Sequence, residues 1–550
     1  MDSFDYVIVG AGSAGCVLAN RLSADPSVTV CLLEAGPRDW HPMIHVPAGF
    51  MKTLTDPMVN WLYEAEPSEG TAGRVIKAPR GKTLGGSSSI NGHIYNRGQS
   101  LDYDTWSQLG NTGWGYADVL PYFRRCERRV PGPLSTTDET YRGQDGEMVV
   151  SDIDFRHPLC EAFIEGAVSI GIPRNGDYNG RTQEGVSYAQ RTIHKGRRMS
   201  TARAFLKPAM GRPNLTVRTG AHATRILLEE KRAVGVVYRK GGRRGAEREV
   251  CARREVLLSG GAVNSPQLLQ VSGIGPGALL SQLGITPRHE APGVGENLRD
   301  HYAPRFTARI KDMQTINELA RGWRLYGQVA KWLTTGKGIL SLSPTQVYGF
   351  WHSDEAQRSG DLQFTFTPAS YHEGVQSQLD TEPGVTIAAW QQRPDSLGHV
   401  RARTADPFEK PEIQPNYLAA ESDQRVFLAG MKLARRLLRT APLAPYVAHE
   451  AYPGDHVQSD EELMAIGRAR GTTTYHLMGT CRMGPDSDPT AVVDDQLRVK
   501  GLTGLRVIDA SIMPTMLSAN LNAGVMMIAD KASDMILGKP AMAPIITARD

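Results

Sequence analysis

The sequence has few cysteines and lacks any long uninterrupted apolar run. Its six cysteines form no close pairs and no metal-ligand spacing; they are Cys16, Cys31, Cys126, Cys160, Cys251 and Cys481. Scattered thiols are typical of free cysteines in a reducing compartment and exclude a disulfide-dense scaffold, and we expect no metal site. Even the late apolar run is broken by Asp530, Lys531 and Asp534, so no segment approaches the ~20 residues that span a bilayer.

Neither sign of charge is in large excess, since the formal net charge is +4 over 550 residues. The densest basic tract, 239–244, contains glycines but no aromatic residue, and it lies between two apolar-alternating runs, 233–238 and 249–252. This pattern predicts a solvated hairpin turn rather than a nucleic-acid-binding patch. The first strand-like run begins at Phe4 and leaves no room for a signal peptide ahead of it. We therefore expect a cytoplasmic protein with no nucleic-acid partner and no membrane span.

What is present is the composition of an ordinary globular protein, with 40% apolar and 22% charged residues. A chain of 550 residues exceeds the size at which a single hydrophobic core keeps growing. We therefore expect at least two domains, or one elaborated domain, with room for a deep cofactor site.

The N-terminus carries a strand, a glycine turn and a helix in succession. Residues 5–9 are a short apolar, β-branched run, 10–15 read Gly-Ala-Gly-Ser-Ala-Gly, and 16–22 have helical spacing. A second buried strand, 28–33, is followed by Glu34. A glycine fingerprint alone is a weak signal, but its flanking strands, helix and acidic residue together predict a dinucleotide site.

Each residue of this fingerprint has a physical reason. Gly10 permits a tight turn, Gly12 lets the backbone approach a pyrophosphate, and Gly15 lets the helix pack against the strand. The positive end of the helix then faces the phosphate charge. A carboxylate at Glu34 suits ribose hydroxyls but would repel a 2′-phosphate, so we expect FAD or NAD rather than NADP.

A glycine-rich and serine-rich loop extends over residues 78–98. It is too polar for core and too regular for a linker. Its amides and hydroxyls suit a backbone cradle for phosphate or a flavin edge, although composition alone fits a flexible surface loop equally well.

Several long segments in this order carry a family resemblance. The first runs from Gly81 to Asn91, reads GKTLGGSSSIN, and continues through Tyr95, Gly98 and Asp104. The others are residues 261–269 with 272–275, residues 292–298 with Asp300 and His301, and the C-terminal stretches 475–476, 479–484, 507–511 and 520–523. Together they resemble the glucose-methanol-choline (GMC) oxidoreductases along nearly the whole chain, in a branch with choline dehydrogenase-like enzymes and aryl-alcohol or hydroxymethylfurfural oxidases.

The resemblance implies a mixed α/β fold with a Rossmann-like FAD-binding domain of discontinuous segments and a substrate-binding domain built on a β-sheet. The domains are expected to comprise residues 1–155, 196–301 and 466–550 for FAD, and 156–195 and 302–465 for the substrate. Residues 363–368 and 398–403 are expected to be strands of the substrate-binding sheet.

The resemblance also assigns the chemistry, namely oxidation of a primary alcohol by hydride transfer to the flavin. It places His476 on the substrate side of flavin N5, paired with Asn522. Hydride leaves a carbinol carbon readily only as charge builds on its oxygen, so a base must take the hydroxyl proton. His476 can accept that proton, whereas the Asn522 amide can orient the alcohol but cannot titrate. Without the family, a structural histidine and a helix cap would be the ordinary interpretations of these two residues.

FAD is expected to be bound without a covalent tether, because the position at which some relatives carry a linking histidine is Ile90. The residues that the resemblance assigns to FAD are Gly10, Gly12, Ser13, Ala14, Gly15, Glu34, Ala35, Leu84, Gly86, Ser87, Asn91, Gly92, Ala223, Asp509, Ala510 and Asn522. For Asp509, the alternative is a buried carboxylate that caps a backbone turn. The apolar run 525–537 predicts a helix that begins near Asn522 and directs its positive end at the flavin.

The substrate and the oxidant stay open. Tyr475 and the aromatic residues Phe364, Phe366, Trp351 and Trp390 suggest an apolar pocket for aryl or aliphatic alcohols, but each could equally be sheet core. A choline-specific dehydrogenase, a hydroxynitrile lyase, a photodecarboxylase and a non-catalytic flavoprotein are the alternatives, and oxygen or a quinone could reoxidise the flavin. His93 could line the site or bond within its loop.

Overall fold

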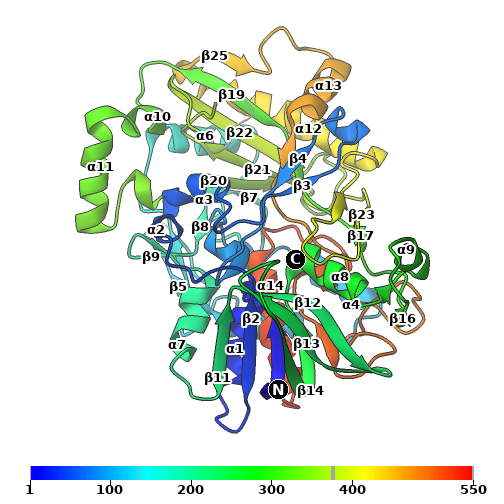
Figure 1. The fold of residues 1–550 in the computed structure, drawn as a ribbon. Coiled ribbons are helices and arrows are strands. Elements are labelled where there is room, and N and C mark those ends of the chain that lie inside the picture. The colour runs from blue at the N-terminus through cyan, green and yellow to red at the C-terminus, as the bar shows by residue number, and fades with distance from the viewer. Residues whose placement is uncertain (1, 134, 373–377, 548–550) are drawn as a thin grey trace.

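The computed structural model describes residues 2–133, 135–372 and 378–547. They form a mixed α/β molecule with two large sheets, one in each half (Figure 1). The N-terminal strand belongs to the lower sheet of that view, and the C-terminal helix α14 (Asn522–Ile536) lies between the two halves. The α/β fold expected from the sequence is therefore confirmed.

The lower sheet has seven strands, five of them parallel. The parallel strands are β11 (Leu215–Thr219), β2 (Val30–Glu34), β1 (Asp2–Val9), β14 (Glu247–Leu258) and β27 (Leu505–Val507). Strand β13 (Arg232–Lys240) pairs antiparallel with β14, and β12 (Ala221–Glu229) pairs antiparallel with β13. The basic tract 239–244 covers the end of β13 and the turn that leads to β14, so the predicted hairpin is present.

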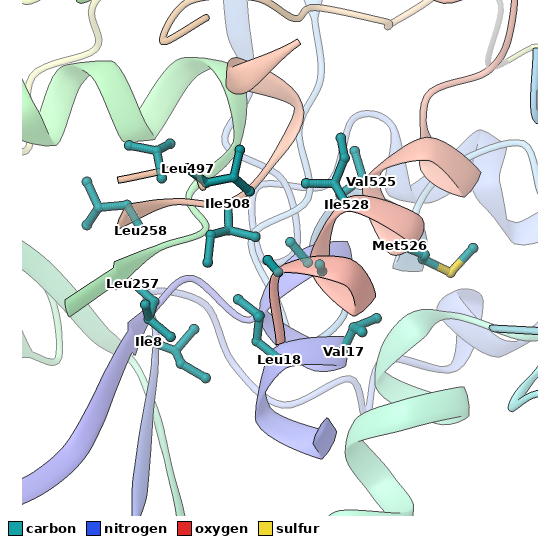
Figure 2. Close-up of a cluster of buried hydrophobic side chains, with 14 of the residues drawn as sticks. Ile8, Val17, Leu18, Leu257, Leu258, Leu497, Ile508, Val525, Met526 and Ile528 are labelled. Carbon is teal, nitrogen blue, oxygen red and sulfur yellow. The ribbon is translucent and has the colours of Figure 1, made fainter. Parts of the chain in front are cut away.

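Two helices cover one face of this sheet, and they come from opposite ends of the chain. Helix α1 (Ser13–Leu22) packs directly against α14. Figure 2 shows Val17 and Leu18 of α1, Val525 and Met526 of α14 and Ile8 of β1 in one buried hydrophobic cluster. Close packing is possible because nearly every residue of α1 is small or aliphatic and buried.

The upper sheet has six antiparallel strands in its central part. They are β25 (Val447–Tyr452), β19 (Arg305–Ile310), β22 (Gly384–Gln391), β21 (Leu362–Thr367), β20 (Val347–Trp351) and β7 (Gly185–Tyr188). Its outer face packs against α6 (Pro158–Ser169) and α12 (Glu421–Leu438), where Phe163 stacks on Phe366 with 4.4 Å between ring centroids. The opposite face is turned toward the functional site described below.

Smaller elements connect the two halves. The short strand groups are β3 (Tyr63–Ala65) with β4 (Ile76–Ala78), β5 (Glu127–Val130) with β6 (Met148–Asp152) and β8 (Gln190–Arg191), β9 (Ile193–His194) with β10 (Arg197–Arg198), β15 (Ile274–Gly275) with β16 (His289–Glu290), β17 (Glu296–Leu298) with β23 (Gly398–Arg401) and β24 (Glu412–Gln414), and β18 (Tyr302–Ala303) with β26 (Thr472–Thr473). The expected strand at 398–403 therefore exists as β23, but its assignment to the large substrate-side sheet is wrong, because β23 pairs with β17 and β24 instead.

The remaining helices lie around the two sheets. They are α2 (Pro42–His45), α3 (Phe50–Thr53), α4 (Ser100–Gln108), α5 (Tyr116–Cys126), α7 (Lys207–Ala209), α8 (Gly261–Val271), α9 (Gly277–Gln282), α10 (Ile316–Leu319), α11 (Gly322–Thr335) and α13 (Asp460–Arg470). Over the described ranges, none of the helices is both long and apolar enough to cross a membrane. All six cysteines are free thiols.

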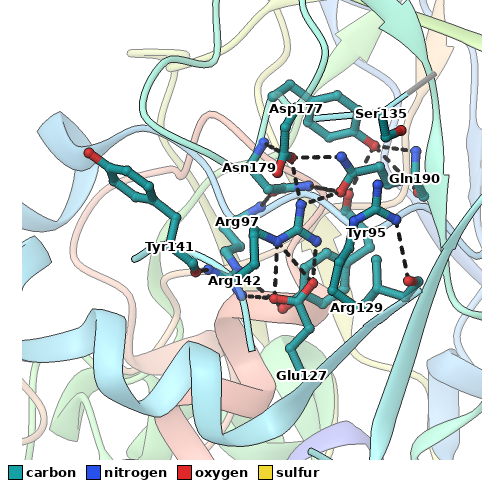
Figure 3. A network of polar contacts seen from close by, with 12 residues as sticks. Tyr95, Arg97, Glu127, Arg129, Ser135, Tyr141, Arg142, Asp177, Asn179 and Gln190 are labelled. Atoms are coloured by element: carbon teal, nitrogen blue, oxygen red, sulfur yellow. Dashed lines mark hydrogen bonds and ion pairs between the residues drawn. The ribbon is translucent and has the colours of Figure 1, made fainter. Parts of the chain in front are cut away.

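A buried ionic network ties the segments between the sheets together (Figure 3). The Glu127 carboxylate accepts hydrogen bonds from both Arg97 and Arg142. Arg142 also donates to Asp177 at 2.5 Å and to Gln190 at 2.8 Å. The side chains of Arg97, Arg142 and Glu127 are at most 1% exposed. Each charge is therefore compensated by partners rather than by water.

We expect Arg142→Ala to destabilise the protein by about 3 kcal/mol, because it leaves two carboxylates buried with fewer partners. The measurement is the thermal midpoint by calorimetry. Lys432→Ala is the matched control, since it breaks an ion pair whose side chains are 54% and 51% exposed and should cost at most ~1 kcal/mol. Equal midpoints for the two variants would contradict this account of the network.

Candidate active site

The carboxyl ends of all five parallel strands meet at one edge of the lower sheet. Gly10 follows β1, Glu34 ends β2, Ala223 lies two residues into the strand after β11, Ser259 follows β14, and Asp509 follows β27. All five residues line one cavity of about 410 Å³. In doubly wound sheets, this edge is where nucleotide ligands bind.

The glycines of the first turn are required by close backbone contacts. Gly10 has φ of +99°, and a Cβ atom there would lie 2.5 Å from the Ser259 carbonyl oxygen. A Cβ atom at Gly15 would lie 1.9 Å from the Gly10 carbonyl oxygen, and one at Gly86 would lie 2.7 Å from Gly12 Cα. The loop 78–98 is thus packed on the glycine turn as a cradle, and α1 begins with no side-chain cap and no acidic residue in its first turn. Its free amides are left for an anion.

Glu34 is held by the same turn. Its two carboxylate oxygens accept hydrogen bonds from the backbone amides of Ala11, at 2.9 Å, and Gly36, at 2.7 Å. Burial raises the pKa of Glu34 to about 7. Each oxygen retains a second lone pair that can accept a hydroxyl hydrogen from a ligand.

Most of the residues that the sequence assigned to the cofactor line this cavity. They are Gly10, Gly12, Ser13, Ala14, Glu34, Ala35, Gly86, Ser87, Asn91, Gly92, Ala223, Asp509, Ala510 and Asn522. Gly15 and Leu84 do not line it: Gly15 packs on Gly10, and Leu84 is buried in the core beside the loop. The sequence missed Ser259, which no motif singled out, and His222.

Asp509 and Asn522 both make protein contacts that limit their roles. The Asp509 carboxylate lines the cavity and also caps the adjoining turns, accepting from the amides of Gly261 and Ser511 and from the Ser265 hydroxyl. Asn522 Oδ1 accepts from Ser13 Oγ at 2.7 Å. Asn522 is the first residue of α14 and Leu521 is its cap, so Asn522 is not the helix cap.

The partner of His476 is Asn520, and the predicted pairing with Asn522 is wrong. Asn520 Nδ2 lies 3.1 Å from His476 Nε2, whereas the Asn522 side chain accepts from the Ser13 hydroxyl. Asn520 precedes α14 and so points toward His476, while Asn522 already belongs to the helix and faces the glycine turn.

A second histidine, His301, contacts the Nδ1 side of the His476 ring, opposite Asn520. In the sequence, His301 is named only as part of a family motif and is given no role. His301 Nδ1 lies 2.9 Å from His476 Nδ1, and His301 Nε2 lies 2.6 Å from the Gln392 carbonyl oxygen. A carbonyl can only accept, so His301 carries its proton on Nε2 and its Nδ1 is an acceptor. Burial lowers the pKa of His301 to about 4, which keeps this ring neutral. His476 therefore carries its proton on Nδ1, where His301 Nδ1 at 2.9 Å and the Thr474 hydroxyl oxygen at 2.8 Å can accept it, and its Nε2 lone pair is directed at Asn520.

Asp300 holds both histidines in place. Its Oδ1 accepts from the backbone amides of His301, at 2.9 Å, and His476, at 2.7 Å. Its Oδ2 accepts from the hydroxyls of Tyr417 and Thr473. One fully buried carboxylate therefore fixes the backbone of two segments far apart in the sequence.

His476 is neutral at ordinary pH for electrostatic reasons. Burial lowers its pKa well below 6.5, and the neighbouring His301 and Arg80 lower it further. A neutral imidazole with a free Nε2 is the form that accepts a proton.

One face of the upper sheet forms the wall opposite His476. In register across four strands, Arg305, Ala388, Thr365 and Tyr348 all line the cavity. The adjacent row of Phe306, Ile387, Phe366 and Val347 points to the other face and is core. This alternation follows from the two-residue period of a strand.

The aromatic residues named from the sequence divide accordingly. Phe364 and Phe366 are core, and Trp351 packs at the edge of that core. Trp390 and Tyr475 line the cavity. His93 also lines the cavity and is fully buried, and burial lowers the pKa of its ring well below 6.5.

The residues present fit an FAD molecule. The capless helix end, the glycine cradle and the Glu34 carboxylate match a pyrophosphate and a ribose. The Ser259 hydroxyl lines the cavity and is buried without a hydrogen-bond partner among the described residues, which indicates a polar ligand. Over the described residues, no group of three or more His, Cys, Asp or Glu side chains could hold a metal ion.

Comparison with known proteins agrees with this site. The family models described as GMC oxidoreductase match residues 4–303 and 394–529. The chain is 43% identical to human mitochondrial choline dehydrogenase, over 98% of this chain and 91% of the relative. It is 41% identical to the alcohol dehydrogenase [acceptor] of Pseudomonas putida, over 98% and 97%. A formate oxidase structure from Aspergillus oryzae, studied for modification of its FAD, superposes with a TM-score of 0.90 at 27% identity over 98% of each chain.

The two asparagines give a matched pair of variants. We expect Asn520→Ala to slow anaerobic flavin reduction by an alcohol about 100-fold at full flavin occupancy, because it removes a donor to the reacting oxygen. Asn522→Ala should instead weaken FAD binding, through loss of the Ser13 contact. Stopped-flow absorbance gives the rate, and flavin titration gives the affinity. A slower chemical step in Asn522→Ala than in Asn520→Ala would contradict the assignment.

The depressed pKa of His476 gives a pH prediction. The base form is complete above the folded pKa, which lies well below 6.5, and is lost only as pH falls through it. The rate constant for flavin reduction should therefore be constant from pH 6.5 upward and fall only in more acidic solution. A rate that kept rising with pH above 6.5 would show that His476 is not already neutral.

Proposed function

Because this chain belongs to the GMC oxidoreductase family and is an FAD-dependent alcohol oxidoreductase, we propose that it oxidises a primary alcohol to an aldehyde with His476 as the base. The observation that carries this proposal is the position of His476 Nε2, which carries no proton and accepts a hydrogen bond from the Asn520 amide nitrogen at 3.1 Å. Bound FAD supplies the acceptor for the hydride.

The chain's own residues handle the proton and the orientation of the alcohol. An alcohol hydroxyl that bridges the two side chains from the cavity donates to His476 Nε2 and accepts from Asn520 Nδ2. As the carbinol hydrogen leaves with its electron pair, His476 takes the hydroxyl proton and Asn520 stabilises the charge that builds on the oxygen. Asn520 takes the role that the sequence had given to Asn522.

The charges around this point favour a neutral alcohol over choline. Among the described lining residues, the only carboxylates are Glu34 and Asp509, and both lie at the carboxyl edge of the parallel sheet. The lining residues near His476 include Arg80, which lowers the pKa of the histidine. A quaternary ammonium group requires an anion or an aromatic cage without competing cations. We therefore favour aryl or aliphatic primary alcohols, although human choline dehydrogenase is a relative.

The test is anaerobic reduction of the flavin by benzyl alcohol, 1-hexanol and choline. The neutral alcohols should bleach the flavin band, with kcat/KM at least about tenfold above that for choline. His476→Ala should bind FAD but reduce it at least about 100-fold more slowly. Admitting air to the reduced enzyme then distinguishes an oxidase from an enzyme that needs a quinone.

Two outcomes would contradict the proposal. A fully flavinated protein that no alcohol reduces would make carbon–carbon cleavage of a cyanohydrin, as in the hydroxynitrile lyases, the next reaction to assay. Preferred turnover of choline would mean that the charges near His476 do not determine the substrate.

A further inference from the structure

Helix α11 lies at the edge of the molecule, outside both sheets (Figure 1). It is attached along one side only: Trp332 Nε1 donates to the Gly196 carbonyl oxygen at 2.8 Å, and Gln328 Oε1 accepts from the Ile339 amide at 3.2 Å. No residue of the helix is buried. A surface helix of this length ordinarily presents polar side chains on its outer face.

The outer face of α11 is apolar instead. Trp323, Tyr326, Ala330 and Leu333 follow the spacing i, i+3, i+7, i+10 and so share one side of the helix. Trp323 is 79% exposed, Tyr326 78% and Leu333 69%. No other described helix or strand carries as many large hydrophobic side chains that are this exposed. The attached side, with Gln328 and Trp332, lies roughly opposite on the helical wheel.

Positive charge borders this apolar stripe. Residues 319–341 contain Arg321, Arg324, Lys331 and Lys337 and no Asp or Glu, but Glu318 lies directly before them, and Arg321 donates to the Asp380 carbonyl oxygen. The Arg324 guanidinium lies 5.7 Å from the centre of the Trp323 ring.

The neighbouring turn adds further cations. The turn between β9 and β10 contacts Gly336 at the end of the helix and carries the exposed Lys195 and Arg197. The helix and the turn therefore combine an exposed Trp, Tyr and Leu with exposed Arg and Lys side chains, and neither residues 319–341 nor residues 194–197 contain an Asp or Glu.

We propose that the outer face of α11 binds an anionic lipid surface, lying in the plane of the interface without crossing it. Indole and phenol rings partition into the headgroup region of a bilayer, and Leu333 adds apolar area. The cations beside the stripe attract anionic headgroups, which a neutral protein surface would not supply. Burial of an apolar stripe together with charge attraction makes binding both composition-dependent and salt-sensitive.

The test is co-sedimentation of the FAD-loaded enzyme with vesicles. One set contains phosphatidylcholine alone, and the other contains equal parts of phosphatidylcholine and phosphatidylglycerol. The wild type should sediment with the anionic vesicles and much less with the neutral ones. The triple variant Trp323→Ser, Tyr326→Ser, Leu333→Ser should lose vesicle affinity about tenfold or more. All three side chains are largely exposed, so folding and flavin content should be retained.

Two further variants separate the contributions. Arg324→Gln with Lys331→Gln should bind anionic vesicles more weakly and with less dependence on salt. Leu101→Ser with Leu397→Ser is the matched control, because these exposed apolar residues, 42% and 48% accessible, lie on other elements. The control should sediment like the wild type.

The proposal is overturned if the wild type does not sediment with anionic vesicles, or if the triple variant sediments as well as the control. It is also overturned if light scattering shows a dimer that the triple variant converts to a monomer while vesicle binding is absent. That result would make the stripe a contact between two copies of the chain.

Discussion

The contact between Nδ1 of His301 and Nδ1 of His476 can form only if one ring donates and the other accepts. The Gln392 carbonyl behind His301 decides which, and so determines the protonation of the ring that faces the alcohol. The pairing of β18 with β26 brings the two histidine segments together, and the Asp300 carboxylate holds both backbones. A small set of hydrogen bonds thus fixes both the place of the base and its reactive atom.

The two sheets supply different parts of the same cavity. The parallel sheet contributes the ends of its strands, where backbone amides and a helix terminus suit an anionic dinucleotide. The antiparallel sheet contributes a face, where alternate side chains such as Thr365 and Tyr348 form the wall opposite the base. Substrate preference can therefore vary along the sheet face without disturbing the cofactor cradle, because the opposite side of each strand forms the core.

The sequence predicted the parts of the site that depend on local pattern. The glycine turn, the acidic end of β2 and the helix after residue 521 each have a short-range signature, and all lie where expected. The resemblance paired His476 with Asn522, whereas the asparagine that contacts it lies two residues earlier, because a motif match does not show which of two nearby side chains points at the histidine.

Long-range contacts were beyond the sequence. His301 and Gln392 are 91 residues apart, and nothing local links them to each other or to His476. The same holds for the aromatic residues, since only the strand register separates Trp390, which faces the cavity, from Phe366, which faces the core. The division into domains stays a prediction. The reaction was inferred from the family resemblance, whereas the hydrogen-bond donors and acceptors around His476 were found in the structure.

The central claim is that His476 carries its proton on Nδ1 and presents a bare Nε2 to the alcohol. Neutron crystallography of the FAD-loaded enzyme at neutral pH tests it most directly, because deuterium on each ring nitrogen becomes visible. The account predicts deuterium on Nδ1 of His476 and on Nε2 of His301, with none on Nε2 of His476. Deuterium on Nε2 of His476 would contradict the account, since that atom could not then accept the proton of the alcohol.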